Sequence, residues 1–182
     1  MITFKKLWDN HPTNTDHKDP CVTNSQKNFS NQCAIRVGVS LAECGIKTAS
    51  IPGAIHCWHG HDKSEGHVIR AEKLANGLTK ISLPGLKPVI KVNPNEFSKE
   101  LSGKKGIVFF KDYWQRTISG KKESFRNRSG DHIDIWNGNR ITDLSSWARI
   151  NLRIGSFGIH SITDRFSDYE DSKEIWFWET HQ

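Results

Sequence analysis

The spacing of apolar residues changes along this chain, and that change restricts the folds it can adopt. In the first half, apolar positions recur three or four residues apart, as on one buried helical face, at Ala34, Val37, Leu41 and Cys44. In the second half, short runs such as 106–110 are continuously apolar, as in buried strands. Helices followed by strands predict an α+β fold, with N-terminal helices packed on a mostly antiparallel sheet. A length of 182 residues suits a single domain.

The first convincing helix is expected from about Gln32 to Cys44. Asn31 can cap its first turn, and Gly45 can end it in the left-handed conformation that glycine tolerates. Residues 1–30 are polar and rich in turn formers, so they are expected to form a leader segment on the surface of the same domain.

Further elements follow from capping and turn residues. A second helix is expected over 67–76, with Gly77 as its C-cap, and a third from Asn93 to near Gly103. The expected strands span 88–92, 106–110, 131–136, 139–143 and 174–179.

The dipeptide Asn137-Gly138 is the strongest hairpin signal in the chain. A two-residue turn there places His132 opposite Asp143, with Cβ atoms roughly 4.5–5.5 Å apart. Asp143 can then accept from one ring nitrogen and leave the other free to take a proton. Asp134 shares this face two residues along the strand and is the reserve candidate, whereas Asp131 points to the opposite face.

Cys33 lies in the first turn of the expected helix. Unpaired N–H groups and the positive dipole end at that position stabilise a thiolate, which is the form in which cysteine is a nucleophile. The sequence therefore predicts a catalytic set of Cys33, His132 as base and Asp143 as the group that orients the base. The alternatives are a small buried structural cysteine and a surface His–Asp pair without function.

Three segments give this pattern a specific resemblance. Residues 31–36 (NQCAIR), 106–114 (GIVFFKDYW) and 130–138 (GDHIDIWNG) resemble the fourth family of type VI secretion amidase effectors. The resemblance runs from about residue 31 to the C-terminus and implies a papain-like fold. It also implies a Cys–His–Asp triad that falls on Cys33, His132 and Asp143.

The resemblance implies an antibacterial peptidoglycan amidase that cuts the γ-D-glutamyl–meso-diaminopimelate bond of stem peptides. The implied partners are peptidoglycan, the type VI secretion apparatus and a periplasmic immunity protein that plugs the cleft. The N-terminus has no apolar signal segment, and no run is long enough to cross a membrane. Synthesis in the cytoplasm, export without a signal peptide and action in the periplasm of a target bacterium are therefore expected.

In the expected mechanism, His132 deprotonates Cys33 and the thiolate attacks the glutamyl carbonyl. The backbone N–H of Cys33 is the natural oxyanion donor, and Gln32 is a weak candidate for the second donor. Arg36, one turn further along, is expected to form a salt bridge within the fold, and the alternative is that it binds a substrate carboxylate.

Histidine and cysteine gather in one loop, at His56, Cys57, His59, His61 and His67. Their spacing matches no closed zinc motif, so neither a metal nor another cofactor is expected, and the loop can instead line the substrate cleft.

Three cysteines remain once Cys33 is assigned. Cys44 is expected in the core. Cys21 and Cys57 can bridge in an oxidising compartment, and the resemblance implies that related effectors use loop disulfides, but the sequence leaves the pairing open.

The formal net charge is +6, without a long basic run. This balance fits a wall polymer rich in carboxylates, and nucleic acid is not an expected partner. The rival functions are a papain-like protease acting on proteins, a basic nuclease or nucleic-acid-binding toxin, and a non-catalytic wall-binding module.

Overall fold

The computed structural model describes residues 1–142 and 169–181. Four antiparallel strands form one sheet in the order β3-β8-β4-β7. They span Ile90–Val92 (β3), Gly106–Trp114 (β4), Gly130–Trp136 (β7) and Glu174–Glu179 (β8). The predicted α+β class is confirmed.

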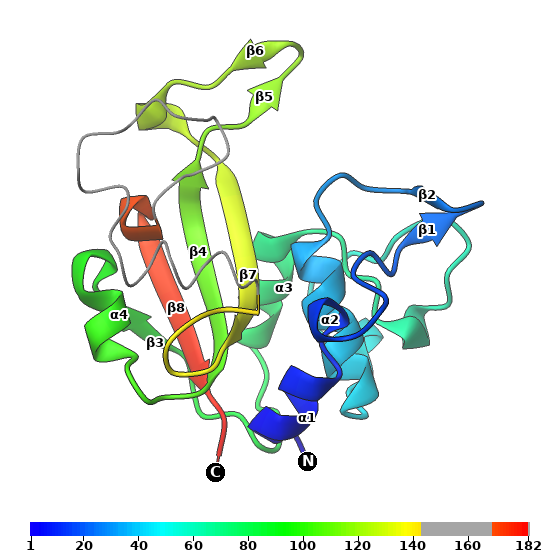
Figure 1. Cartoon of the computed structure of the whole chain (residues 1–182), viewed down its shortest axis with the longest axis horizontal. Coiled ribbons are helices and arrows are strands. Elements are labelled where there is room, and N and C mark those ends of the chain that lie inside the picture. Colours follow the sequence, from blue (N-terminus) through cyan, green and yellow to red (C-terminus); the bar gives the residue numbers. More distant parts are fainter. Residues whose placement is uncertain (143–168, 182) are drawn as a thin grey trace.

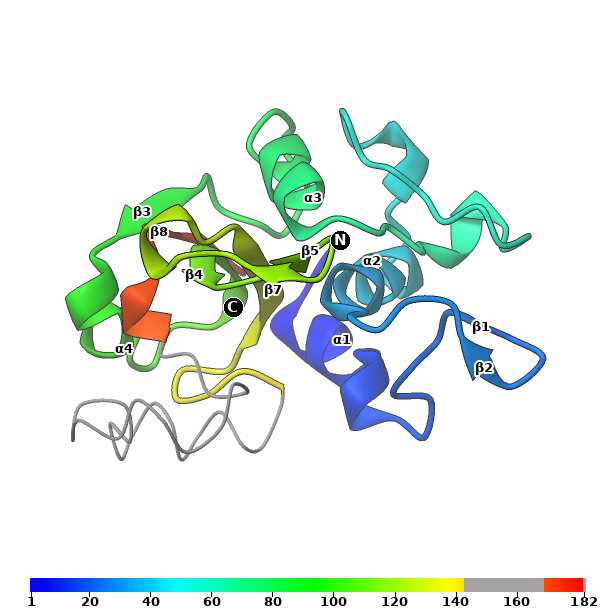
Figure 2. The ribbon, with the colours of Figure 1, turned by 90° about the horizontal axis from the view of Figure 1, so that it is seen from above.

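The helices cover the two faces of this sheet. Figure 1 shows α1, α2 and α3 beside β7, and α4 beyond β8, and the view from above agrees (Figure 2). The helices span Phe4–Asp9 (α1), Cys33–Glu43 (α2), Ala71–Leu78 (α3) and Phe97–Glu100 (α4). Two small ribbons project from the body, β1–β2 (Val22–Thr23, Gln26–Lys27) and β5–β6 (Thr117–Ile118, Lys121–Lys122). Short 3-10 turns span Pro12–Asn14, Thr48–Ser50, Lys63–Glu65, Pro94–Glu96, Phe125–Asn127 and Tyr169–Asp171.

The apolar run at the start of β4 supplies both layers of the core. Ile107 and Phe109 pack on the side of α1, α2 and α3, whereas Val108 and Phe110 pack with α4. All four are fully buried. Successive strand residues point to opposite faces, and both faces here are covered by helices, so the continuous apolar run is explained.

Helix α2 follows its sequence pattern closely. Ala34, Val37 and Leu41 are buried on the predicted face. Gln32 accepts the first intrahelical bond, from Arg36 N–H at 2.9 Å. Gly45 lies just past the end with φ +83°, so the predicted stop is confirmed.

The prediction for the second helix was wrong at both ends. Residues 67–70 are extended, with Val68 bridged to His56, and α3 begins only at Ala71. Gly77 lies inside the helix, where a Cβ would stand 2.7 Å from the carbonyl oxygen of Pro52. The glycine therefore permits close packing against a neighbouring loop and does not act as a C-cap.

The predicted hairpin after β7 was also wrong. Trp136 bridges Ile141, not Asn139, and Asn137 N–H donates to the carbonyl of Arg140 at 3.0 Å. The Asn137 side chain accepts from the backbone N–H groups of Asn139 and Arg140 at 3.0 and 2.9 Å, which stabilises this longer turn. Among the described residues, β7 pairs with β4 and no strand forms over 139–142. The register argument for Asp143 therefore fails.

The other strand predictions are confirmed with small shifts. The strand predicted at 88–92 is shorter, that at 106–110 is longer, and that at 174–179 has the predicted bounds. The Asn93 side chain accepts from Asn95 N–H at 3.1 Å, as expected of a cap, but the turn that follows is a 3-10 turn and α4 begins only at Phe97. Gly103, near the predicted end, has φ +74°.

The first thirty residues are more deeply packed than a surface leader. Ile2 and Leu7 have no exposed surface and belong to the main core. Arg36 holds this segment through the Lys18 carbonyl at 2.6 Å and the Asp19 carboxylate at 2.9 Å, which confirms its predicted salt bridge within the fold. No helix in the described part of the chain is long and apolar enough to cross a bilayer.

Candidate active site

The packing of α2 against β7 brings two sequence-distant side chains together. Cys33 is the first residue of α2, and His132 is the third residue of β7. The Cys33 thiol lies beside the His132 ring, close enough for each group to shift the pKa of the other. Only 7% of Cys33 is exposed. Two residues that the sequence assigned to nucleophile and base therefore touch.

The surroundings favour a negative charge on Cys33 and a positive charge on His132. Burial alone raises the pKa of the Cys33 thiol, but the hydrogen bond and positive charge of His132 outweigh it, so the pKa lies below its usual value. Burial alone lowers the pKa of His132, but hydrogen bonds to Asp134 and Cys33 and their negative charges raise it to about 10. The two directions together shift the pair toward its thiolate–imidazolium form.

Asp134 is the carboxylate that His132 contacts in the described part of the chain. Its Oδ2 lies 3.2 Å from His132 Nε2, which leaves Nδ1 as the nitrogen available to Cys33. Oδ1 accepts from Thr142 Oγ1 and from Ile135 N–H, both at 2.7 Å. Burial opposes ionisation, but the hydrogen bond to His132 and the surrounding positive charge lower the pKa of Asp134 to about 2.

His11 lies behind this carboxylate and was not identified from the sequence. Its Nδ1 accepts from Thr13 N–H at 3.4 Å, so Nε2 carries the proton, and Nε2 lies 3.6 Å from Asp134 Oδ1. His11 is 1% exposed, and burial lowers its pKa to about 4 although Asp134 acts in the opposite direction. Its neighbour Pro12 indicated only a turn, so no sequence signal connected it with β7.

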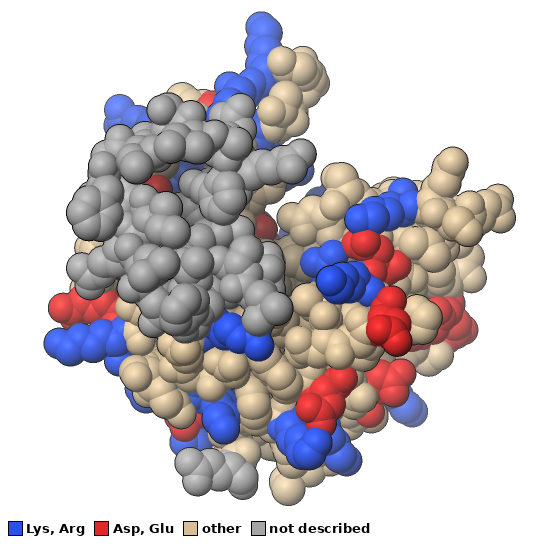
Figure 3. All heavy atoms as spheres, in the orientation of Figure 1, with Lys and Arg blue, Asp and Glu red and all other residues tan. Residues whose placement is uncertain are grey.

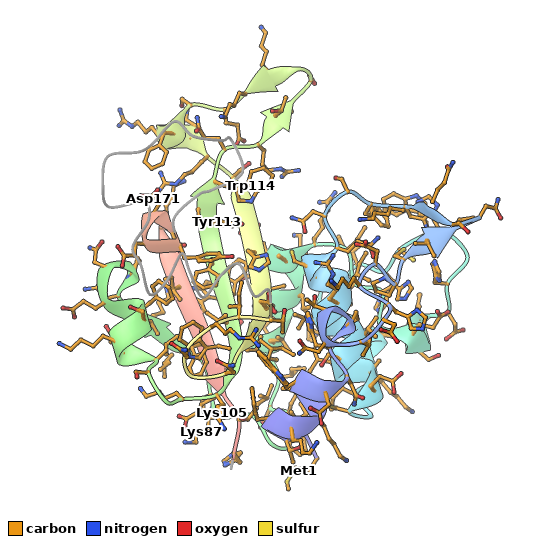
Figure 4. The ribbon with its side chains drawn as sticks, in the orientation of Figure 1. Met1, Lys87, Lys105, Tyr113, Trp114 and Asp171 are labelled. Atoms are coloured by element: carbon orange, nitrogen blue, oxygen red, sulfur yellow. The ribbon has the colours of Figure 1, made fainter. Side chains whose placement is uncertain are left out.

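Aromatic rings surround the His132 imidazole on the side of β4. The ring centroids of Phe110, Tyr113 and Tyr169 lie 6.4, 6.2 and 6.0 Å from that of His132. Figure 4 shows Tyr113 and Trp114 at the upper end of β4. These rings limit the access of water to the imidazole.

Cys33 opens into a cleft of about 550 Å³. The cleft is bounded by the start of α2, the start of α3 and the upper ends of β4 and β7, and it lies at the notch between the two projecting ribbons (Figure 3). Exposed cationic side chains at its rim are Arg70, Lys73 and Arg116. Asp131 also lines it, and burial raises the pKa of this carboxyl to about 6.

Comparison with known families decides the relationship. The family model described as "Type VI secretion system (T6SS), amidase effector protein 4", or Tae4, matches residues 29–178. The chain belongs to the Tae4 family. Its membership assigns it a hydrolase activity on amide bonds.

Two solved structures agree with the Tae4 fold. The crystal structure of the effector–immunity complex Tae4–Tai4 from Enterobacter cloacae matches with a TM-score of 0.57 and 19% identity, covering 100% of this chain and 99% of that chain. The crystal structure of Tae4 from the same organism matches with a TM-score of 0.55 and 18% identity, covering 79% and 85%. No curated protein sequence matches this Tae4 member.

The backbone N–H of Cys33, the expected oxyanion donor, already has a hydrogen-bond partner within this Tae4 member. Cys33 N–H donates to Asn31 Oδ1 at 3.1 Å. The expectation for Gln32 is wrong, because its amide is buried and bonded to the backbone of Cys21, donating at 3.0 Å and accepting at 2.9 Å. Gln32 therefore holds the leader segment and cannot face the cleft. Asp143, the predicted orienting residue, lies outside the described residues.

Proposed function

We propose that this chain hydrolyses the γ-D-glutamyl–meso-diaminopimelate bond of peptidoglycan, with Cys33 as the nucleophile and His132 as the base. The observation that carries the proposal is that the packing of α2 against β7 sets Cys33, which lines a cleft, beside the His132 imidazole. Cysteine amidases need a thiolate beside an imidazole that can later donate a proton, and the charges of this pair supply both.

Acylation follows from that arrangement. The Cys33 thiolate attacks the glutamyl carbonyl, and a C–S bond forms while the carbonyl oxygen becomes an oxyanion. When the C–N bond breaks, His132 transfers its proton to the leaving amine of diaminopimelate. Water, deprotonated by His132, then hydrolyses the thioester and restores the thiol.

The oxyanion requires a change at the helix start. Cys33 N–H now donates to Asn31 Oδ1, and Asn31 is exposed at the cleft. A substrate carbonyl oxygen that approaches Cys33 replaces Asn31 Oδ1 and accepts the hydrogen bond from Cys33 N–H. The Cys33 N–H binds the substrate oxygen more strongly as an oxyanion than as a neutral carbonyl. Replacement of Asn31 Oδ1 by the substrate oxygen therefore favours the transition state.

Two carboxylates compete for the third catalytic role. The family motif assigns it to Asp143, which remains a proposal from the sequence. The contact at 3.2 Å supports Asp134, which accepts from His132 Nε2 while Nδ1 serves Cys33. Either carboxylate performs the same task, because it fixes the ring orientation and stabilises the imidazolium.

The cleft suits a stem peptide with several carboxylates. Arg70, Lys73 and Arg116 are exposed cations at its rim. The α-carboxylate of D-glutamate and the carboxylates of diaminopimelate are ligands for such side chains. A neutral protein segment offers fewer anionic groups, which favours the wall substrate over a protein substrate.

The test is digestion of diaminopimelate-type sacculi with wild-type protein and Cys33→Ala. Mass spectrometry of the soluble muropeptides should show loss of the diaminopimelate-containing portion with wild type alone. Cys44→Ser is the matched control, because Cys44 follows the same helix but packs into the core, and it should retain activity.

Other outcomes discriminate the rivals. Hydrolysis of casein by wild type indicates a protease. Nucleic acid cleavage that survives Cys33→Ala indicates a nuclease, and sacculus binding without product indicates a wall-binding module. Any of these, with folded protein and no cut at the proposed bond, rejects the amidase assignment.

We also propose that the effector acts in the periplasm of a target bacterium after type VI secretion, and that an immunity protein of the producing cell covers the cleft. The family description and the Tae4–Tai4 complex support this proposal. A Tai4-type protein from the producing strain should abolish muropeptide release at stoichiometric concentration.

A further inference from the structure

A second cluster of chemically reactive side chains lies on the far side of α2 from the sheet. It comprises Cys21 from the leader and Cys57, His61 and His67 from the following loop, with one ligand atom of each within 4.8 Å of the other three. Cys21, Cys57 and His67 are buried, and His61 is half-buried. Hydrophobic contacts alone do not explain two buried cysteines facing two imidazoles.

The ring nitrogens are oriented in a consistent way. His67 Nδ1 lies 3.9 Å from Cys57 Sγ, and its Nε2 lies 3.9 Å from Glu65 Oε2. His61 Nδ1 lies 3.4 Å from the same Glu65 oxygen. His61 Nε2 is buried and has no hydrogen-bond partner among the described residues. One nitrogen of each ring therefore faces the carboxylate, and the other is left for the cluster.

We propose that Cys21, Cys57, His61 and His67 bind a zinc ion in a closed tetrahedral site. Two thiolates and two imidazoles are a preferred zinc ligand set, and Zn–S about 2.3 Å with Zn–N about 2.0–2.1 Å places neighbouring donors roughly 3.3–3.8 Å apart. The present separations need to contract by only about 1 Å to reach that range. Two thiolates neutralise the ion, which suits its buried position, and binding releases their two protons.

The surrounding groups are those that a zinc site uses outside its ligands. Glu65 Oε2 lies 3.4 Å from His61 Nδ1 and 3.9 Å from His67 Nε2, so its negative charge favours tautomers that carry the proton on these outer nitrogens. Asn28 Nδ2 donates to Cys21 Sγ at 3.5 Å, as donors do to zinc-bound thiolates. All four tetrahedral positions are taken by protein, so the ion is structural and leaves no position for a substrate.

The site links the leader to the catalytic helix. The Gln32 side-chain amide accepts from the backbone N–H of Cys21 and donates to its carbonyl, and Gln32 directly precedes Cys33. A metal that fixes Cys21 therefore also fixes the start of α2. Its role is to position the nucleophile, without contact with the substrate.

The experiment measures metal directly in the full chain. Protein purified under reducing conditions without a histidine tag should contain about one zinc ion per chain by elemental analysis and native mass spectrometry. Cys57→Ser and His61→Ala should each lose most of it. Cys44→Ser and His59→Ala are matched controls, since neither residue belongs to the cluster, and both should keep wild-type zinc.

Cobalt substitution keeps the test decisive if a variant does not fold. Co²⁺ in wild-type protein should give the strong visible bands of a tetrahedral site and a thiolate charge-transfer band. The proposal is overturned if reduced wild type holds no zinc, if both ligand variants keep it, or if Cys21 and Cys57 form a disulfide that excludes the metal. Zinc content is measured without substrate, so a negative result leaves the amidase proposal intact.

Discussion

At the scale of single residues, the behaviour of Cys33 depends on a chain of buried partners. His132 stabilises the thiolate, Asp134 stabilises the imidazolium, and His11 lies beyond Asp134. Burial disfavours the charged form of each side chain, and the neighbouring partner stabilises that charged form. Removal of one member should therefore change the titration of the next.

The reactivity of Cys33 should extend to lower pH than that of an ordinary thiol. Its pKa is lowered by His132 against the effect of burial, so the thiolate is present above that lowered pKa and is lost below it. In His132→Ala, burial and the negative charge of Asp134 remain and should raise the pKa of the thiol. Alkylation of Cys33 by iodoacetamide, followed by peptide mass spectrometry over a pH series, measures both; identical profiles in the two proteins contradict the ion pair.

The rate of hydrolysis should also fall on the alkaline side. The pKa of His132 is raised to about 10, so above that value the imidazole no longer carries the proton that the leaving amine needs. The pH dependence of kcat/KM on muropeptides checks this limb. A decline centred near the usual imidazole value would show that the ring is not stabilised as imidazolium in the free enzyme.

The asparagine variants of Asp134 and Asp143 should differ in activity. Asp134→Asn removes the charge at 3.2 Å from His132 and should lower kcat by roughly a hundredfold or more, with the alkaline limb shifted to lower pH. Asp143→Asn should have a smaller effect if Asp134 holds the ring. The reverse ranking of the two variants in kcat would assign the role to Asp143, as the family motif does.

His11 should make the fold sensitive to acid. Burial lowers its pKa from 6.5 to about 4, so the folded state binds fewer protons than the unfolded state as pH falls through this window. The free energy of unfolding should drop by up to about 3 kcal/mol between these values, and the drop should be smaller in His11→Gln. Urea unfolding at the two ends of the window measures the difference; equal losses in both proteins count against it. Asp134 titrates below this window, with its pKa near 2.

At the scale of elements, α2 is held close to the histidine-containing loop by two glycines. A Cβ at Gly38 would lie 2.1 Å from the backbone oxygen of Gly66, and one at Gly66 would lie 2.3 Å from that of Gly38. Backbone cannot move aside as a flexible side chain can. The close approach brings the loop of the proposed zinc site against α2, which begins at Cys33.

Gly38→Ala should therefore destabilise the protein, although alanine is the better helix former. The helix preference gains about 1 kcal/mol, but overpacking against backbone costs roughly 1–3 kcal/mol and the strain moves α2. Chemical denaturation should show a net loss together with lower activity. Glu43→Ala, exposed on the same helix, is the control and should change stability by less than about 0.5 kcal/mol. A stabilised Gly38→Ala would contradict the packing.

Local patterns predicted the elements whose partners are near in sequence. The buried face of α2 and its stop at Gly45 follow from helical periodicity and backbone freedom, and the β8 bounds follow from alternation. The hairpin after β7 failed because side-chain bonds of Asn137 favour a longer turn than Asn-Gly alone predicts. Cys33 and His132 were assigned as nucleophile and base from the helix start, the turn and the family motif. Asp134 was ranked behind Asp143 because the predicted hairpin paired His132 with Asp143, and the structure does not form that hairpin.

At the scale of the whole molecule, the leader and the matched family segment form one packed unit. Ile2 and Leu7 lie in the core with α2 and α3, and His11 lies against Asp134. Over the face shown in Figure 3, lysines, arginines and acidic residues are intermixed along α1, α2 and β1–β2 in the part of the chain that is described. On this face, therefore, the cations of the described residues are interleaved with carboxylates.

A fragment of residues 29–178 should be less stable than the full chain and nearly inactive. It lacks Ile2 and Leu7, and loss of each large buried side chain typically costs about 2–5 kcal/mol. Lys5→Ala in the full chain is the control, because that side chain is exposed and should leave the denaturation midpoint unchanged. Equal midpoints and activities for fragment and full chain would show that the leader is dispensable.

The position of His11 and Cys21 ahead of residue 29 has a consequence for how such toxins can be recombined. An exchange that joins a foreign N-terminal stretch to the segment beginning at residue 29 removes two native contacts. These are the contact of Cys21 with Gln32, at the start of α2, and that of His11 with Asp134. Functional chimeras are therefore expected only when the first 28 residues and α2 come from the same parent protein. Recombination within this family is therefore expected to transfer the first 28 residues together with the segment that carries Cys33.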